Sequence, residues 1–163
     1  MGKEVKTNAM RILDKEKIPY ESVFYECDEF IDGIQIADAT GTPYDESFKT
    51  LVLQGKSQQF YVLVLPIDQE VNLKKAAKAV GEKSLEMIHV KDIQKITGYV
   101  RGGCSPVGMK KKYKTVYDES IRKHPKVYIS GGRIGVKLKV EVEGLLRVTE
   151  GSVCDLVDET PAV

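Results

Sequence analysis

The stretch Phe48-Lys-Thr-Leu-Val-Leu-Gln54, the turn Gly55-Lys-Ser57 and the stretch Gln59-Phe-Tyr-Val-Leu-Val-Leu65 together predict a β-hairpin. Both arms are almost continuously apolar, which is typical of central strands that are buried on both faces. The glycine in the short connection favours a tight turn between antiparallel strands. We therefore expect this hairpin to form the core of the fold.

The remaining segments are predicted to be short helices and strands. Helices are expected over residues 7–17, 34–40, 73–80, 91–97 and 142–149, several of them stopped by a glycine. Strands are expected over residues 20–26, 84–89, 113–117, 127–130 and 134–140, with a shorter one near 153–157. Because strands outnumber helices and are joined both by hairpins and by helices, the pattern favours a mixed α+β fold with one curved sheet.

The length and composition indicate one globular domain. The chain has 163 residues, of which 42% are hydrophobic and 30% are charged, values that are usual for such a domain. We expect the domain to span residues 1–158 and a loose tail to follow at residues 159–163. No apolar run approaches the roughly 20 residues that cross a bilayer, and the charged N-terminal sequence does not match a signal peptide. A cytoplasmic protein without a membrane partner is therefore expected.

Cysteine usage points in the same direction. The three cysteines, Cys27, Cys104 and Cys154, are an odd number at wide spacing without a CxxC pair. This suits a reduced compartment better than a disulfide framework or a zinc site. Histidine, cysteine and carboxylate residues also lack the spacing of metal ligands. No metal and no cofactor are expected.

The net charge of +1 conceals two parts of opposite sign. Residues 99–139 contain eleven lysines and arginines against two acidic residues, a net charge of +9, so the rest of the chain carries −8. Such a basic segment can be a solvated surface, since lysine is a common exposed residue. It can also bind a polyanion, which makes nucleic acid a candidate partner.

Two glycine-rich loops and one lysine are candidates for a binding site. The loops Gly98-Tyr-Val-Arg-Gly-Gly-Cys-Ser-Pro-Val-Gly108 and Ser130-Gly-Gly132 could present backbone N–H groups to a carbonyl oxygen or a phosphate, although a Gly-Gly pair is also an ordinary turn. Lys49 lies near the start of the apolar hairpin, where lysine is uncommon unless it has a function. Strand alternation could instead direct it to solvent.

Cys104 and the lysines after the first loop allow further interpretations. Backbone N–H groups and Arg101 could lower the pKa of the Cys104 thiol and make it a nucleophile, but an inert loop side chain is the favoured interpretation. The lysine cluster at residues 110–114 could hold a phosphate backbone, with Tyr113 available to stack on a base.

Four stretches, in this order, resemble the YbaK/EbsC family of the aminoacyl-tRNA editing domain superfamily. They are Phe48-Lys-Thr-Leu-Val52, Leu73-Lys-Lys-Ala-Ala-Lys-Ala79, the loop over residues 97–108 and Tyr128-Ile-Ser-Gly-Gly-Arg-Ile-Gly135. This family includes bacterial Cys-tRNA(Pro) deacylases, relatives of the editing domain of prolyl-tRNA synthetases. The resemblance implies a barrel-like mixed sheet with surrounding helices, and hydrolysis of the ester that joins a wrong amino acid to tRNA.

The resemblance also implies the site residues. Lys49, Gly102 and Gly103 would be catalytic. The substrate would be bound by Tyr25, Phe30, Thr50, Ser105, Ser130, Gly131 and Gly132. The tRNA would be bound by the basic residues Arg101, Lys110, Lys111, Lys112, Lys114 and Arg133. Many members carry an acid where this chain has Lys137, so no contact is carried over at that position.

The mechanism that the resemblance implies needs no protein nucleophile. The thiol of the substrate's own cysteine attacks its ester carbonyl and leaves as a cyclic thiolactone, a lyase-like route in which the protein positions the group and stabilises developing charge. The expected function is therefore a trans-editing hydrolase for Cys-tRNA(Pro), with Cys-tRNA(Cys) left open as a second substrate and prolyl-tRNA synthetase as a transient partner. An Ala-tRNA(Pro) deacylase of the same fold and a non-catalytic RNA-binding or regulatory protein are the alternatives.

Overall fold

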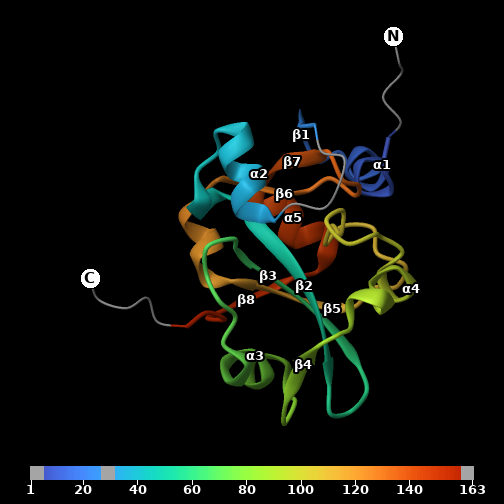
Figure 1. The fold of residues 1–163 in the computed structure, drawn as a ribbon, viewed down its shortest axis with the longest axis vertical. Helices are drawn as coiled ribbons and strands as arrows, with labels where there is room; N and C mark the ends of the chain where they lie inside the picture. Colours follow the sequence, from blue (N-terminus) through green and yellow to red (C-terminus); the bar gives the residue numbers. More distant parts are fainter. Residues whose placement is uncertain (1–5, 27–31, 159–163) are drawn as a thin grey trace.

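The predicted hairpin lies at the centre of a five-stranded sheet (Figure 1) in the computed structural model, which describes residues 6–26 and 32–158. β2 (Phe48–Gly55) and β3 (Phe60–Pro66) pair antiparallel, with Leu51 opposite Leu63. β4 (Leu85–Met87) pairs with the end of β2, while β5 (Lys114–Asp118) and β8 (Ser152–Cys154) follow β3 in parallel. The prediction of a central hairpin is confirmed.

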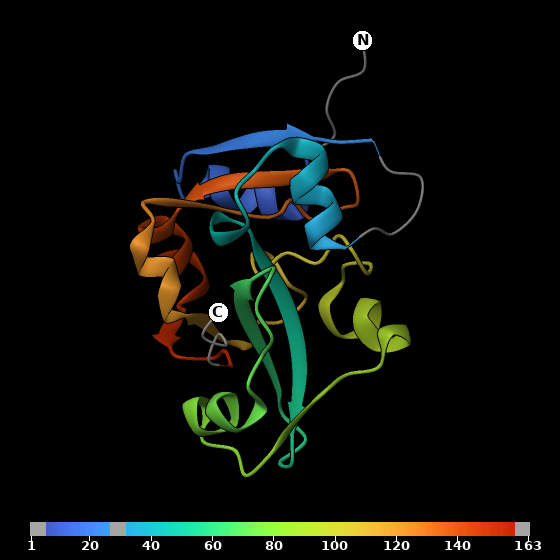
Figure 2. The ribbon, with the colours of Figure 1, turned by 60° about the vertical axis from the view of Figure 1, so that its left-hand side comes forward.

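A second sheet has three antiparallel strands in the order β1-β7-β6: β1 (Tyr20–Phe24), β7 (Val136–Glu141) and β6 (Lys126–Ser130). Side chains alternate between its two faces. One face packs against α1 (Asn8–Lys15) and α5 (Val142–Thr149) through residues such as Leu138. The other face carries Tyr128 and Lys137 and lies under α2 (Gly33–Thr40) (Figure 2). The sheet therefore separates an apolar core from a polar space beneath α2.

A second core lies on the other side of the central hairpin. Leu53, Leu63 and Leu65 of β2 and β3 pack there against α3 (Leu73–Val80). Full burial of a leucine side chain contributes about 1.5–3 kcal/mol. Because both cores include residues of β2 and β3, the start of β2 is held in a fixed position.

The helix ends follow chemical signals in the sequence. Asn72 caps α3, and Asp32 caps α2 in a capping box with Gln35. Glycines in the left-handed conformation end α2, α3 and α4 (Ile93–Thr97), at positions 41, 81 and 98. The five predicted helices are confirmed, although the fourth begins with a 3-10 turn, η2 (Val90–Asp92). The 3-10 helices η1 (Tyr44–Glu46) and η3 (Glu119–Lys123) have no counterpart in the prediction.

The prediction of one curved sheet is wrong, because the strands form two sheets that meet at a single parallel bridge between Ser47 and Tyr128. η1 directly precedes Ser47, and its helical residues cannot extend the pairing. The last strand lies at residues 152–154 rather than near 153–157. The mixed α+β class is confirmed, and over the described residues the sheets do not close into a barrel.

Three parts of the prediction fall outside the described residues: the tail at 159–163, Cys27 and Phe30. Within residues 6–26 and 32–158, every helix is too short or too polar to span a bilayer.

Candidate functional site

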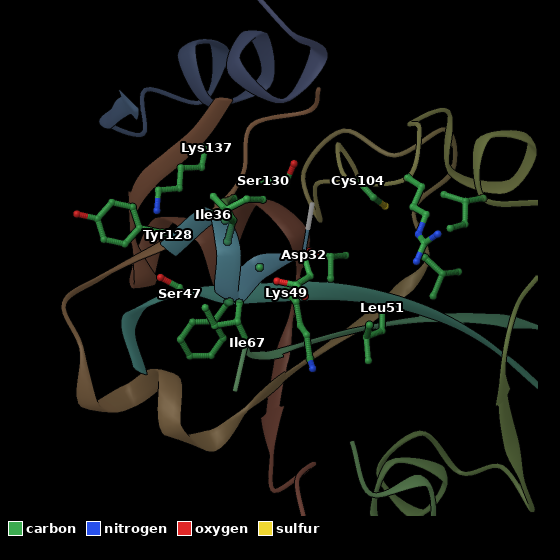
Figure 3. Close-up of a pocket in the computed structure, with 18 of the residues that line it drawn as sticks. Asp32, Ile36, Ser47, Lys49, Leu51, Ile67, Cys104, Tyr128, Ser130 and Lys137 are labelled. Atoms are coloured by element: carbon green, nitrogen blue, oxygen red, sulfur yellow. The ribbon is translucent and has the colours of Figure 1, made fainter. Parts of the chain in front are cut away.

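A cavity of about 380 Å³ opens between the start of β2, α2, the polar face of the three-stranded sheet and the loop that follows α4 (Figure 3). The predicted site residues that line this cavity are Tyr25, Lys49, Thr50, Arg101, Gly102 and Ser130. They come from β2, from both glycine loops and from the residue after β1, so only the fold brings them together.

The walls of the cavity are largely apolar. α2 contributes Ile36, the strands contribute Phe48 and Leu51, and Ile67 follows β3. The polar groups lie at separate points along these walls. A mostly apolar concave site with a few placed polar groups is typical of a small-ligand site.

Lys49 lies half-buried near the start of β2. Burial lowers the pKa of its ammonium, and the negative charges of Glu70 and Asp68 oppose this shift. In Figure 3 its side chain leaves β2 on the side away from Lys137. Lys49 is therefore a partly desolvated cation that lines the cavity.

Thr50 leaves the opposite face of β2 from Lys49, because successive side chains alternate along a strand. Its Oγ1 is buried and has no hydrogen-bond partner among the described residues. Leaving a buried hydroxyl unpaired costs about 1–3 kcal/mol. Because Thr50 lines the cavity, its hydroxyl is suited to bind a polar atom of a ligand, which would supply the absent partner.

The two adjacent glycines of the first glycine loop, Gly102 and Gly103, have different surroundings. Gly102 lines the cavity and has a φ of +85°, which other residues rarely adopt. Gly103 donates its N–H to the carbonyl oxygen of Val100 at 2.9 Å, and a Cβ there would lie 2.7 Å from the Cα of Arg133. Gly103 thus allows the two glycine loops to pack together, and its N–H is already used.

Cys104 also lines the cavity, but its environment disfavours a reactive thiolate. Burial raises the pKa of the Cys104 thiol to about 11. The proposed lowering of this pKa by the loop N–H groups and Arg101 is therefore wrong, because removal from water dominates. The structure supports the interpretation of Cys104 as a loop side chain.

In the second glycine loop, Ser130 lines the cavity while the glycines hold the turn together. Gly131 donates its N–H to Val136 at 3.0 Å and accepts a bond from the Thr7 hydroxyl at 2.5 Å. Gly132 has a φ of +101° and donates to the Ser130 hydroxyl at 3.4 Å. Neither glycine lines the cavity. Ser105 of the first loop is also internal, since its buried hydroxyl accepts from the N–H of Val107.

The predicted tRNA-binding residues are separated by the fold. Only Arg101 among them lines the first cavity. Lys111 and Lys112 border a second cavity, of about 430 Å³, between the first glycine loop, α1 and α5, where Lys112 pairs with Glu150. The side chains of Lys110, Lys114 and Arg133 are exposed. Most of the basic segment therefore faces solvent away from the first cavity.

Tyr113 makes two contacts within the protein. Its hydroxyl donates to the carbonyl oxygen of Ile96 at 2.7 Å, and its half-buried ring packs edge-on to Phe60 with the centroids 6.0 Å apart. These contacts fix the orientation of the ring, and its stacking on a base stays a prediction.

Lys137 is a cavity residue to which the sequence assigned no role. It has 6% exposure, and its Nζ donates to Thr40 Oγ1 at 2.5 Å and to Thr42 Oγ1 at 2.6 Å. The ring centroid of Tyr128 lies 4.7 Å away. Burial lowers the pKa of Lys137 to about 8. The alternation of apolar and charged residues in β7 signals that Lys137 leaves the core, but it cannot signal that α2 covers the other face.

Comparisons with known proteins identify relatives of the chain. A family model described as the aminoacyl-tRNA editing domain matches residues 34–148. A protein of Enterococcus faecalis, named "Putative Cys-tRNA(Pro)/Cys-tRNA(Cys) deacylase EbsC", is 39% identical over 152 residues, which are 93% of each chain. A proline--tRNA ligase of Fervidobacterium nodosum is 30% identical over 129 residues, which are 72% of this chain and 22% of the ligase.

Solved structures share the fold. A crystal structure of a "putative trans-editing enzyme for prolyl tRNA synthetase" has a TM-score of 0.81 at 23% identity and covers 96% of this chain and 100% of its own. That of a hypothetical protein has a TM-score of 0.84 at 21% identity, covering 93% of this chain and 99% of its own. At such identities the likeness establishes the arrangement of helices and strands.

Proposed function

The chain belongs to the aminoacyl-tRNA editing domain family, and from this membership we propose that it is a trans-editing deacylase that cleaves the ester of mischarged Cys-tRNA(Pro). The name of the Enterococcus faecalis relative supports both this substrate and Cys-tRNA(Cys). The match to a segment of a proline--tRNA ligase supports tRNA(Pro) as the carrier of the error.

One observation carries the proposal: Thr50, whose buried hydroxyl has no hydrogen-bond partner among the described residues, lines the same cavity as Lys49 and Gly102. An ester carbonyl and the ribose of a 3′-terminal nucleoside are rich in hydrogen-bond acceptors. The Thr50 hydroxyl and the Lys49 ammonium can donate to such acceptors, and the apolar walls exclude water around them. The cavity thus suits the acyl end of an aminoacyl-tRNA.

We assign the ester cleavage to the substrate's own thiol. The sulfur attacks the carbonyl carbon, and the bond from that carbon to the ribose oxygen breaks, which releases a cyclic thiolactone. The protein then contributes orientation and charge stabilisation. The raised pKa of Cys104 is consistent with this route, because a protonated thiol is a poor nucleophile.

The rest of the tRNA is assigned to the exposed basic residues. Arg101 stands at the cavity, while Lys111 and Lys112 border the neighbouring one. Cations at such positions would attract the phosphates of the acceptor end in a salt-dependent manner. One small domain contacts only part of a tRNA, so a transient complex with prolyl-tRNA synthetase is included in the proposal; co-elution of the two proteins with tRNA tests it.

The test is deacylation of Cys-, Ala-, Ser- and Pro-tRNA(Pro) by the wild-type protein, with spontaneous hydrolysis subtracted. We expect release of cysteine to be fastest and release of serine to be at least about tenfold slower, because a hydroxyl is a far weaker nucleophile at neutral pH. Preferential release of alanine would instead identify an Ala-tRNA(Pro) deacylase. Binding of all four tRNAs without loss of any ester would identify a non-catalytic RNA-binding protein.

A further inference from the structure

Lys137 is a buried cation that the proposed function leaves without a role. It lies in β7 between Val136 and Leu138, which point into the apolar core, and its own side chain points the other way, into the cavity beneath α2. Within residues 6–26 and 32–158 no carboxylate forms an ion pair with it. Burial of an ammonium is costly without compensation, so its retention inside a cavity points to a ligand.

The hydrogen bonds of Lys137 determine which of its N–H groups remains available to a ligand. The Thr40 hydroxyl donates its proton to the carbonyl oxygen of Ile36 at 2.7 Å, so its oxygen can only accept from Lys137. Thr42 accepts a second bond. An ammonium has three N–H groups, and one is therefore left for the cavity side, beside the ring of Tyr128. Hydroxyls and a ring orient the ammonium but do not neutralise its charge.

Among residues 6–26 and 32–158, three other charged residues line the cavity. Lys49 and Arg101 line it from β2 and from the first glycine loop. Asp32 is the lining acid among the described residues, and its carboxylate accepts the N–H of Gln35 at the start of α2. Lys139, the next residue of β7 on the same face, lies 5.5 Å from the ring of Tyr128, and Tyr25 also lines the cavity. A buried ammonium that has only neutral hydrogen-bond partners among the described residues favours a ligand group that becomes negative.

We propose that Lys137 is a catalytic residue that stabilises the thiolate of the cysteinyl group, an inference that rests on the proposed function. The thiol releases its proton to solvent water, and the resulting sulfur anion lies against the free N–H of Lys137. The sulfur then forms its bond to the carbonyl carbon. The bond from that carbon to the ribose oxygen breaks with its electron pair on oxygen, which takes a proton from water.

Thiol chemistry fits this cation better than the side chains of other amino acids. An unperturbed thiol has a pKa of about 8.5, and an adjacent opposite charge lowers such a value by about 1–3 units. The thiolate fraction at neutral pH then rises about tenfold or more. A serine hydroxyl does not ionise in this range, and alanine has no group to ionise. Lys137 would thus favour cysteine because the cysteine thiol is acidic. The size of the cavity alone would discriminate weakly between amino acids of similar volume.

The protonation state of Lys137 is compatible with this role. Because its pKa lies at about 8, the side chain is mostly charged at pH 7 and loses its charge as the pH rises through that value. A free thiol ionises unaided at similarly alkaline pH. The benefit of Lys137 is therefore expected to be largest below pH 8 and to vanish above it.

The test measures single-turnover deacylation of Cys-tRNA(Pro) between about pH 6 and about pH 9 for the wild type and for Lys137→Met. Lys139→Met is the matched control, because Lys139 lies on the same strand and face but does not line the cavity. We expect Lys137→Met to be about tenfold slower or more near pH 6.5 and to approach the wild type near pH 9, while Lys139→Met follows the wild type throughout. Lys137→Gln, which retains an N–H donor for the threonines, replaces Lys137→Met if the latter does not fold.

Two outcomes would overturn the inference. Equal rates of wild type and Lys137→Met at every pH would exclude a role in the reaction. A loss that is the same at every pH would show that Lys137 merely holds α2 against the sheet through Thr40 and Thr42.

A second measurement separates this inference from the proposed function. The thiol pKa of a bound amide analogue, 3′-cysteinylamino-3′-deoxyadenosine, is read from the ultraviolet absorbance of its thiolate. We expect a thiol pKa at least about one unit lower on the wild type than on Lys137→Met; the same value on both would refute the inference. If the wild type lowers this pKa yet cleaves no ester, the proposed function fails and the role of Lys137 in thiol binding stands.

Discussion

The first and second cavities described above are similar in volume, about 380 Å³ and about 430 Å³, and both are bordered by lysines. In the first, Lys137 is buried and Lys49 is half-buried, and burial lowers the pKa of each. In the second, Lys111 and Lys112 are exposed, and Lys112 pairs with Glu150. Water and salt screen an exposed cation, whereas a buried one acts strongly on a single nearby group. Under the proposed function, burial of the cations, rather than their number, would therefore distinguish the reaction site from the surface that binds tRNA.

The largest effect is expected in the first cavity, from Lys49→Ala. Loss of a cation that stabilises developing charge should lower the rate of Cys-tRNA(Pro) deacylation about 10²-fold or more, measured in single turnover. Lys56→Ala, in the exposed turn between β2 and β3, is the control and should retain the wild-type rate. Activity that survives Lys49→Ala but disappears in Cys104→Ala would contradict the assignment of the site.

The next largest effect is expected at Thr50, where a substitution should change activity and stability in different directions. Thr50→Val keeps the shape of the side chain and removes its hydroxyl. We expect kcat/KM to fall about tenfold, since the variant cannot donate a hydrogen bond to the substrate, while the free energy of unfolding stays the same or rises by about 1 kcal/mol. Thr50→Ser should restore most of the activity. A Thr50→Val variant that is fully active would show that the unpaired hydroxyl does not face the substrate.

The second cavity should respond differently to loss of charge. Removing Lys111 and Lys112 together is expected to weaken tRNA binding severalfold and to reduce the dependence of log affinity on log salt concentration by about 0.7–0.9 for each phosphate that the variant no longer neutralises. The rate at saturating tRNA should not change. A double Lys74→Ala, Lys78→Ala variant on α3 is the control. A large fall in the saturated rate of the Lys111, Lys112 variant would show that the two cavities act together.

The smallest effect is expected at Cys104. Cys104→Ala should change the deacylation rate by less than about twofold, because a thiol with a raised pKa does not supply a nucleophile at neutral pH. Alkylation of Cys104 in the wild type, followed by mass spectrometry of its peptide, should be slow near pH 8 and accelerate toward pH 11 as the thiolate forms. Exposed Cys154 serves as the internal standard for a reactive site. Rapid alkylation of Cys104 at pH 7 would revive the nucleophile hypothesis.

Local signals in the sequence predicted the helix ends and several residues of the first cavity. α3 begins after Asn72 and ends at Gly81 as predicted, because a side-chain cap and a left-handed glycine act within a few residues. Lys49 stood out as a charge in an apolar strand, and the two glycine loops stood out by composition. These features depend on neighbours along the chain and are therefore readable from it.

The contacts between distant segments were not predictable in the same way. The sequence could not show that Gly103 and Gly131 serve packing while Gly102 lines the cavity, since this depends on the backbones of Arg133 and Val136. Nor could it show that Tyr113 forms a hydrogen bond with Ile96 and a ring contact with Phe60. Each of these outcomes is decided by which segments lie within a few ångströms of each other.

The sequence by itself determined the α+β class, the central hairpin, the helix ends and, through its motifs, the family. The tertiary structure alone decided that the strands divide into two sheets and that α2 closes over the polar face of the smaller one. The same lysine-rich strand would be an ordinary solvated surface without that helix. With it, Lys137 is removed from water beside Thr40 and Thr42. The reason is physical: alternation along a strand fixes which way a side chain points, but the dielectric environment that it meets depends on what the rest of the chain places there.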